Sequence, residues 1–174
     1  MSLDIDKPSR LLFAIAEALR SAGLGLKVAG RQDFDGTFDQ AWTLIAIERN
    51  APGGRANDGR IAHVLTVSLQ IIVPPTLDDP GLAACDLASV LKGLITDNRW
   101  GLPGSQCDLP MSIDALPTMF ISETREYLAW TLSFTQTLYL GALLLDDPLG
   151  IPKFARTWEV SDIDDPNQYT ELED

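Results

Sequence analysis

The sequence predicts an α+β fold, in which a mostly antiparallel sheet of about four strands carries two helices on one face. Two observations favour this fold. The segment Tyr127–Leu140 alternates apolar and polar side chains at every second position, interrupted only by Gln136. Period two is typical of a long strand with one buried face, and the other face is expected to be rich in Thr, Ser and Gln. Two further segments repeat apolar residues at three- and four-residue spacing, which is the pattern of an amphipathic helix.

The first half of the chain predicts one helix and one strand. The helix is expected at Ser9–Ala22, where the Ser9 side chain can cap the N-terminus. A strand is expected at Ala41–Glu48. The next segment, Arg49–Arg60, contains three glycines and one proline, so it is predicted to be a long loop between two antiparallel strands.

The second half predicts three more strands and one more helix. A strand is expected at Ile61–Val73, and a helix follows, with Asp79 as its N-cap and Pro80 as its first residue. The glycines and prolines of Arg99–Pro117 predict an irregular region. Met119–Ile121 is expected to be a short strand that precedes the long final one.

The acidic charge is concentrated at the C-terminus. We expect a single domain over residues 1–145 and an acidic extended tail over residues 146–174, which carries −7 of the net charge of −12. An acidic chain without a basic stripe is a poor candidate for specific nucleic-acid binding. The tail is interpreted either as a solvated segment that aids solubility or as an arm that docks on a basic partner.

Other bulk features predict a protein of the cytosol. The longest apolar runs are shorter than the ~20 residues of a membrane-spanning helix, so no membrane partner is expected. Asp4 and Asp6 precede the first apolar run, which argues against a signal peptide. The two cysteines, Cys85 and Cys107, are too few for a disulfide framework. A single bridge between them stays open.

Few residues are suited to catalysis. His63 is the only histidine, and a general base needs an orienting carboxylate and a nucleophile, which no sequence feature supplies. A zinc site needs several Cys or His ligands. The chain also lacks the glycine-rich phosphate-binding motifs. We therefore expect no enzymatic activity, no cofactor and no metal, with His63 in a structural role.

Two groups of residues are candidates for contacts with a partner or with another copy. The first group is the set of arginines in the predicted loop, which either project from the sheet to a partner or only keep a solvated loop soluble. The second group is the set of apolar residues in the tail, which either form an interface or fold back on their own domain. The candidates are Arg49, Arg55, Arg60, Leu149, Ile151, Phe154 and Trp158.

The order of elements and the final strand, LAWTLSFTQTLYL, resemble small neck proteins of long-tailed bacteriophages. The similarity is to the tail-terminator family, to which the minor tail protein U of lambda-like phages belongs, and it covers roughly residues 9–140. The long region Arg99–Pro117 and the extended C-terminus depart from the family pattern.

The resemblance implies a non-enzymatic phage or prophage protein. It would form a homo-oligomeric ring, a hexamer in the family, that terminates the tail tube and meets tail-tube and head-completion proteins. It would occupy the host cytoplasm during assembly and then the neck of the virion. Two alternatives stay open: another tail, baseplate or secretion-apparatus interaction module, and a small-molecule-binding domain or enzyme.

Overall fold

A five-stranded, mostly antiparallel sheet with two helices forms the main part of the molecule, so the predicted α+β class is confirmed with one strand more than expected. The computed structural model describes residues 6–122, 125–141, 153–154, 165–168 and 170–171. It divides into two compact units, residues 1–142 and 143–174.

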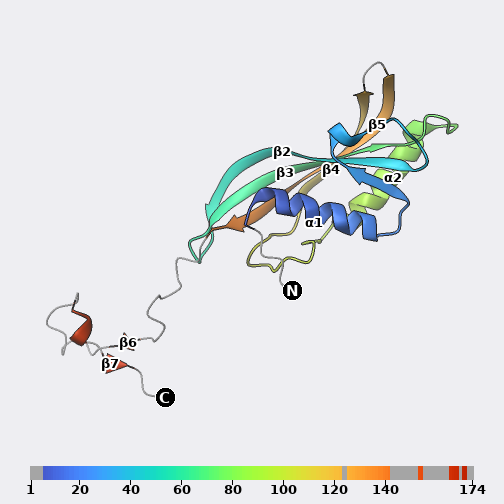
Figure 1. The fold of residues 1–174 in the computed structure, drawn as a ribbon. Helices are drawn as coiled ribbons and strands as arrows, with labels where there is room; N and C mark the ends of the chain where they lie inside the picture. Colours follow the sequence, from blue (N-terminus) through green and yellow to red (C-terminus); the bar gives the residue numbers. More distant parts are fainter. Residues whose placement is uncertain (1–5, 123–124, 142–152, 155–164, 169, 172–174) are drawn as a thin grey trace. The chain divides into compact units, whose positions relative to one another are not determined.

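The strands of the main sheet follow the order β1-β2-β3-β5-β4 (Figure 1). β1 pairs with β2 in parallel, and every other neighbouring pair is antiparallel. Their bounds are Leu26–Ala29 for β1, Ala41–Arg55 for β2, Ile61–Ile72 for β3, Met111–Ser122 for β4 and Arg125–Leu140 for β5. In the second unit, β6 (Lys153–Phe154) pairs antiparallel with β7 (Thr170–Glu171), and a short 3-10 helix, η2, spans Pro166–Gln168.

The two helices, α1 (Pro8–Ser21) and α2 (Pro80–Ile95), pack on one face of the main sheet. The predicted start of α2 is confirmed, because an Asp79 carboxylate oxygen accepts a 2.9 Å hydrogen bond from a backbone N–H of the first turn. The predicted cap of α1 is wrong. That helix begins one residue earlier, at Pro8, and its N-cap Lys7 makes no side-chain capping bond.

The main core lies between these helices and the inward side chains of β3 and β5. On β5 every second residue from Phe134 to Leu140 is buried, as the period-two pattern predicts, whereas the second half of β3 is buried on both faces. The inward residues are Leu65, Val67, Leu69 and Ile71 on β3 and Leu132, Phe134, Leu138 and Leu140 on β5, and they meet Leu11, Ile15, Leu19, Leu91 and Ile95 of the helices.

Gln136 interrupts the apolar face of β5 because it holds a neighbouring segment in place. Its side chain is 1% exposed. Its Oε1 accepts a 2.8 Å hydrogen bond from the indole N–H of Trp100, and its Nε2 donates to the carbonyl oxygens of Asn98 at 3.1 Å and Asp108 at 2.9 Å. These bonds fasten the segment 96–110 against β5, where Trp100 adopts a positive φ of 58°.

The prediction of a loop over Arg49–Arg60 is wrong. β2 continues to Arg55 and pairs with β3 as far as Ile61, so the connection is a tight turn over residues 56–60. β1 pairs only with the first four residues of β2, so the rest of β2 is an edge strand, where proline and bulges are tolerated. Gly53 also fits the strand, since a Cβ there would lie 2.9 Å from the Cβ of Ala62.

Two further expectations need correction. The irregular region is shorter than Arg99–Pro117, because β4 starts at Met111 and includes Pro117. The expected short strand Met119–Ile121 is the end of this twelve-residue strand. β4 lies at the edge of the sheet, where a missing backbone N–H is accommodated. β1, of four residues, was not expected at all.

A second, aromatic cluster covers one end of the face that the helices leave open. Phe34 is at its centre, with ring centroids 5.2 Å from Trp42, 5.0 Å from Phe120 and 5.5 Å from Tyr127. Phe38 adds an edge contact to Phe34 at 5.8 Å. The remainder of this face is not covered by the cluster.

Candidate functional site

The open face of the sheet carries a strip without charge, which we call the charge-free face. It consists of five directly opposed pairs between β3 and β5: Ala62 with Tyr139, Val64 with Thr137, Thr66 with Thr135, Ser68 with Ser133, and Gln70 with Thr131. The outward side chains of β5 in this strip are half-buried rather than fully exposed. On β3, Ala62, Ser68 and Gln70 are buried, so the accessible part of the strip is made of uncharged Thr, Ser, Val and Tyr side chains. An uncharged surface of this kind is suited to contact with another protein surface.

Charged residues border this face on both sides. On β2, Glu48 accepts hydrogen bonds from Ser68 Oγ at 2.5 Å and from Arg31 at 2.8 Å, while Arg49 is exposed opposite Thr66. On β4, Asp114 lies opposite Ser133. The charge-free face is therefore a neutral strip about two strands wide between polar margins.

The three candidate arginines have different environments. Arg49 and Arg55 are exposed. Arg60 is only 8% exposed, and its guanidinium donates to Asp58 at 2.6 and 2.9 Å and to the carbonyl oxygen of Ser105 at 2.6 Å. The hydrogen bond from Arg60 lowers the pKa of the Asp58 carboxyl. Arg60 thus joins the β2–β3 turn to the segment 96–110, and Arg49 and Arg55 are the arginines that another molecule could reach.

The apolar candidates of the tail are not placed by the structure. Leu149, Ile151 and Trp158 lie outside the described residues. Phe154 is described only through its backbone, which belongs to β6. Their predicted role as contacts stays a prediction.

Two titratable side chains that catalysis could use, His63 and Tyr139, make contacts within the main unit. His63 Nδ1 lies 3.3 Å from Asn50 Oδ1 across the β2–β3 hairpin. The Tyr139 hydroxyl donates to Asp108 at 2.8 Å, and this bond raises the pKa of Tyr139. Among the described residues, no three or more His, Cys, Asp or Glu side chains are grouped to hold a metal ion.

The two cysteines are both free thiols. Burial, reinforced by the Asp108 carboxylate, raises the pKa of Cys107 to about 12. A thiol with that pKa stays protonated at neutral pH and is a poor nucleophile. Cys85 on α2 is half-buried.

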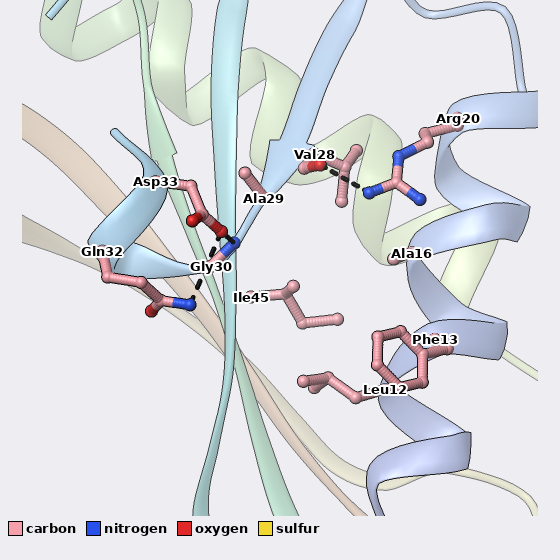
Figure 2. A pocket seen from close by; sticks show the side chains of 10 residues that line it. All are labelled: Leu12, Phe13, Ala16, Arg20, Val28, Ala29, Gly30, Gln32, Asp33 and Ile45. Atoms are coloured by element: carbon pink, nitrogen blue, oxygen red, sulfur yellow. Dashed lines mark hydrogen bonds between the residues drawn. The ribbon is translucent and has the colours of Figure 1, made fainter. Parts of the chain in front are cut away.

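A cavity of about 330 Å³ lies between α1 and the β1 edge of the sheet (Figure 2). Its apolar wall comes from α1, β1 and β2, and its rim is polar. At one end Arg20 donates to the carbonyl oxygen of Val28 at 2.8 Å, and at the other the N–H of Gly30 donates to Asp33 at 3.1 Å. The apolar lining residues are Leu12, Phe13, Ala16, Val28, Ala29 and Ile45.

Exposed apolar side chains gather at the β4–β5 tip beside the start of α2. Met119 and Leu128 are directly opposed in the sheet, and Leu128 reaches the first turn of α2 near Gly81. We call this group the tip patch, which comprises Leu82, Met119, Ile121 and Leu128, each more than half exposed.

Sequence reasoning missed both the cavity and the tip patch, although Phe13 offered one signal. It is an apolar residue off the apolar stripe of its helix, and it is 65% exposed at the mouth of the cavity.

Comparison with models of known protein families finds no match for this sequence, and comparison with curated proteins finds none either. Within the described residues, no helix is long and apolar enough to cross a membrane.

Proposed function

We propose that this protein is a structural component of a phage or prophage, which assembles into a ring at the tail–head junction and terminates the tail tube. Its partners in this role are further copies of itself, the tail-tube protein and head-completion proteins. It acts through surfaces and without catalysis. Arg49 and Arg55 are the exposed arginines placed to contact a neighbouring molecule.

The observation that supports this proposal most is the charge-free face. Ten outward positions on two adjacent central strands carry no charged side chain, in a chain with a net charge of −12. A sheet face that stays in water normally carries charged residues, which keep it soluble. A neutral strip with half-buried Thr and Ser side chains is better suited to a protein–protein contact, whose core is depleted in charge.

The order and length of the elements are also compatible with the resemblance to tail terminators. A helix precedes the long hairpin formed by β2 and β3, and a second helix precedes the hairpin formed by β4 and β5. The strand that prompted the resemblance, β5, lies between β3 and β4 and carries half of the charge-free face.

Light scattering coupled to size-exclusion chromatography, followed by negative-stain electron microscopy, tests the proposal on the full chain. The proposal predicts closed rings of the 19.0 kDa chain, alone or in the presence of purified tail tubes. A monomer at every concentration, with and without tubes, would contradict it.

A charged substitution on the charge-free face tests whether this surface, rather than another part of the molecule, makes the contact. Thr137→Glu adds a carboxylate at a half-exposed position where the monomer can keep it hydrated. It is expected to weaken binding to tail tubes or to neighbouring copies at least tenfold. The control is Ser89→Glu on the exposed side of α2, which adds the same charge on the other face of the sheet and should bind normally.

A further inference from the structure

Two features of the main unit are incompletely covered and complement each other: the cavity beside α1 and the tip patch. The first is a hollow with an apolar wall, and the second is a projecting group of apolar side chains. We propose that copies of this chain join head to tail, with an apolar side chain of one copy's tip patch inserted into the cavity of the next. This inference rests on the proposed self-assembly and specifies its interface.

The cavity is large enough to receive a side chain. Its volume of about 330 Å³ would hold on the order of ten waters at the ~30 Å³ each occupies in the liquid. Waters against Leu12, Ala16 and Ile45 would find few polar partners, so replacing them with an apolar group is favourable. Phe13 stands at the mouth with most of its ring in water and would be covered by the same contact.

The tip patch is suited to be the inserted element. Ile121 is the most exposed of its four members, and Met119 beside it is an unbranched side chain that adapts to irregular hollows. The last five residues of β4, Thr118–Ser122, contain no proline, no bulge and no charge, which are the usual devices that protect an edge strand. The strand at the opposite edge, β1, is short, and the carbonyl oxygen of its Val28 already accepts a hydrogen bond from Arg20.

The charges around the two features are partly complementary. The cavity is lined by one cation, Arg20, and one carboxylate, Asp33, and the tip carries Arg125 and Glu126 on β5. α1 carries Arg10 and Arg20 against a single carboxylate, Glu17. The chain around the start of α2, residues 77–86, carries three carboxylates and no cation. The ion pairs that α1 already makes are exposed and long, 3.7 Å for Arg10 with Asp6 and 3.6 Å for Arg20 with Glu17, so they can exchange for partners on another copy.

The symmetry of such a contact agrees with a ring. The cavity and the tip patch are different surfaces, so their contact is heterologous, and repeated heterologous contacts either close into a ring or continue as a filament. A contact between two identical patches would instead stop at a dimer. A cavity-to-patch contact thus provides the geometry that the proposed function requires.

Four variants and one control test the interface. Phe13→Asp places a charge at the mouth of the cavity, and Ala16→Phe fills the cavity from α1 without adding a charge. Ile121→Asp and Met119→Asp each place a charge in the tip patch. Met111→Asp is the control, because Met111 is just as exposed on the same strand but lies at its other end. Circular dichroism and thermal melting establish that each variant is folded.

Each of the four variants is expected to run as a 19.0 kDa monomer where the wild type and Met111→Asp assemble. An equimolar mixture of Phe13→Asp and Ile121→Asp is expected to form a dimer and nothing larger, because one intact patch then meets one intact cavity. If the folded variants assemble like the wild type, or if they are monomeric and the mixture does not pair, this interface is refuted.

These outcomes distinguish the inference from the proposed function. Rings that form in the wild type and persist in the variants would refute the cavity-to-patch contact alone. A wild type that never assembles would refute the ring itself.

Discussion

Replacing Gln136 with methionine should destabilise the protein far more than the same replacement of another buried glutamine on a central strand. Methionine has nearly the same length and fills the same space, so the substitution changes hydrogen bonding with little change in packing. It would leave the indole N–H of Trp100 and the carbonyl oxygens of Asn98 and Asp108 without their present partner.

The size of the effect follows from the burial of these groups. Trp100 is 5% exposed, so its indole N–H would be left buried without an acceptor, which lowers the free energy of unfolding by ~1–3 kcal/mol. Each of the two lost bonds to a carbonyl oxygen accounts for a further ~0.5–1.5 kcal/mol. The loss is about 4 kcal/mol, a large part of the ~5–15 kcal/mol that stabilises a typical domain.

Urea unfolding, followed by circular dichroism and tryptophan fluorescence, measures this loss as a fall in the transition midpoint at unchanged slope. The matched control is Gln70→Met. Gln70 is also buried, on the adjacent central strand, but its side chain donates only a long hydrogen bond, 3.5 Å, to the carbonyl oxygen of Met119. The control should lose less than ~1 kcal/mol. Equal losses for the two variants would refute the assignment of Gln136 as the anchor of the segment 96–110.

Three further predictions concern single contacts. Asp58→Asn should lower the melting temperature at pH 7. Because Arg60 lowers the Asp58 pKa in the folded state, the difference from wild type should shrink as the pH falls below ~3.9 and vanish below the lowered pKa of the folded state; a constant difference would contradict it. At pH 8 a thiol reagent should label Cys85 but not Cys107, whose pKa is about 12, and both should react in denaturant; native labelling of Cys107 would count against its burial. Asp79→Ala should cost ~1 kcal/mol in urea unfolding through loss of the α2 cap, and no change would show that this cap is not formed.

The sequence predicted those elements whose periodicity agrees with their packing. β5 alternates because one of its faces packs into the core beneath the helices, and α2 has both a capping Asp79 and a Pro80 at its first position. These local signals and the tertiary contacts point to the same structure. Gln136 is the informative exception, because its bonds reach residues 28 to 38 positions away, and no local pattern contains them.

The elements that sequence reasoning missed lie at the edges of the sheet. Pro52, Gly53 and Gly54 predict a loop, yet an edge strand with bulges accepts all three. Pro117 likewise led to the prediction of an irregular region where the structure has β4. Whether a strand is central or at an edge depends on the order of the strands, which a single strand's sequence does not encode.

The candidate contacts show the same limit. From charge and position in the sequence, Arg49, Arg55 and Arg60 were equally good candidates for contacts. The hydrogen bond to Ser105, 45 residues away, distinguishes Arg60 as a structural arginine. The cavity combines α1 with β1 and β2, so it is visible only after the chain is folded.

The most direct test of self-assembly is the mass of the wild-type chain in solution, measured by light scattering during size-exclusion chromatography over a wide range of concentrations. Self-assembly into a ring predicts a discrete oligomer of the 19.0 kDa chain, visible as a closed ring by electron microscopy. A mass of 19.0 kDa at every concentration, unchanged by added tail tubes, would contradict it.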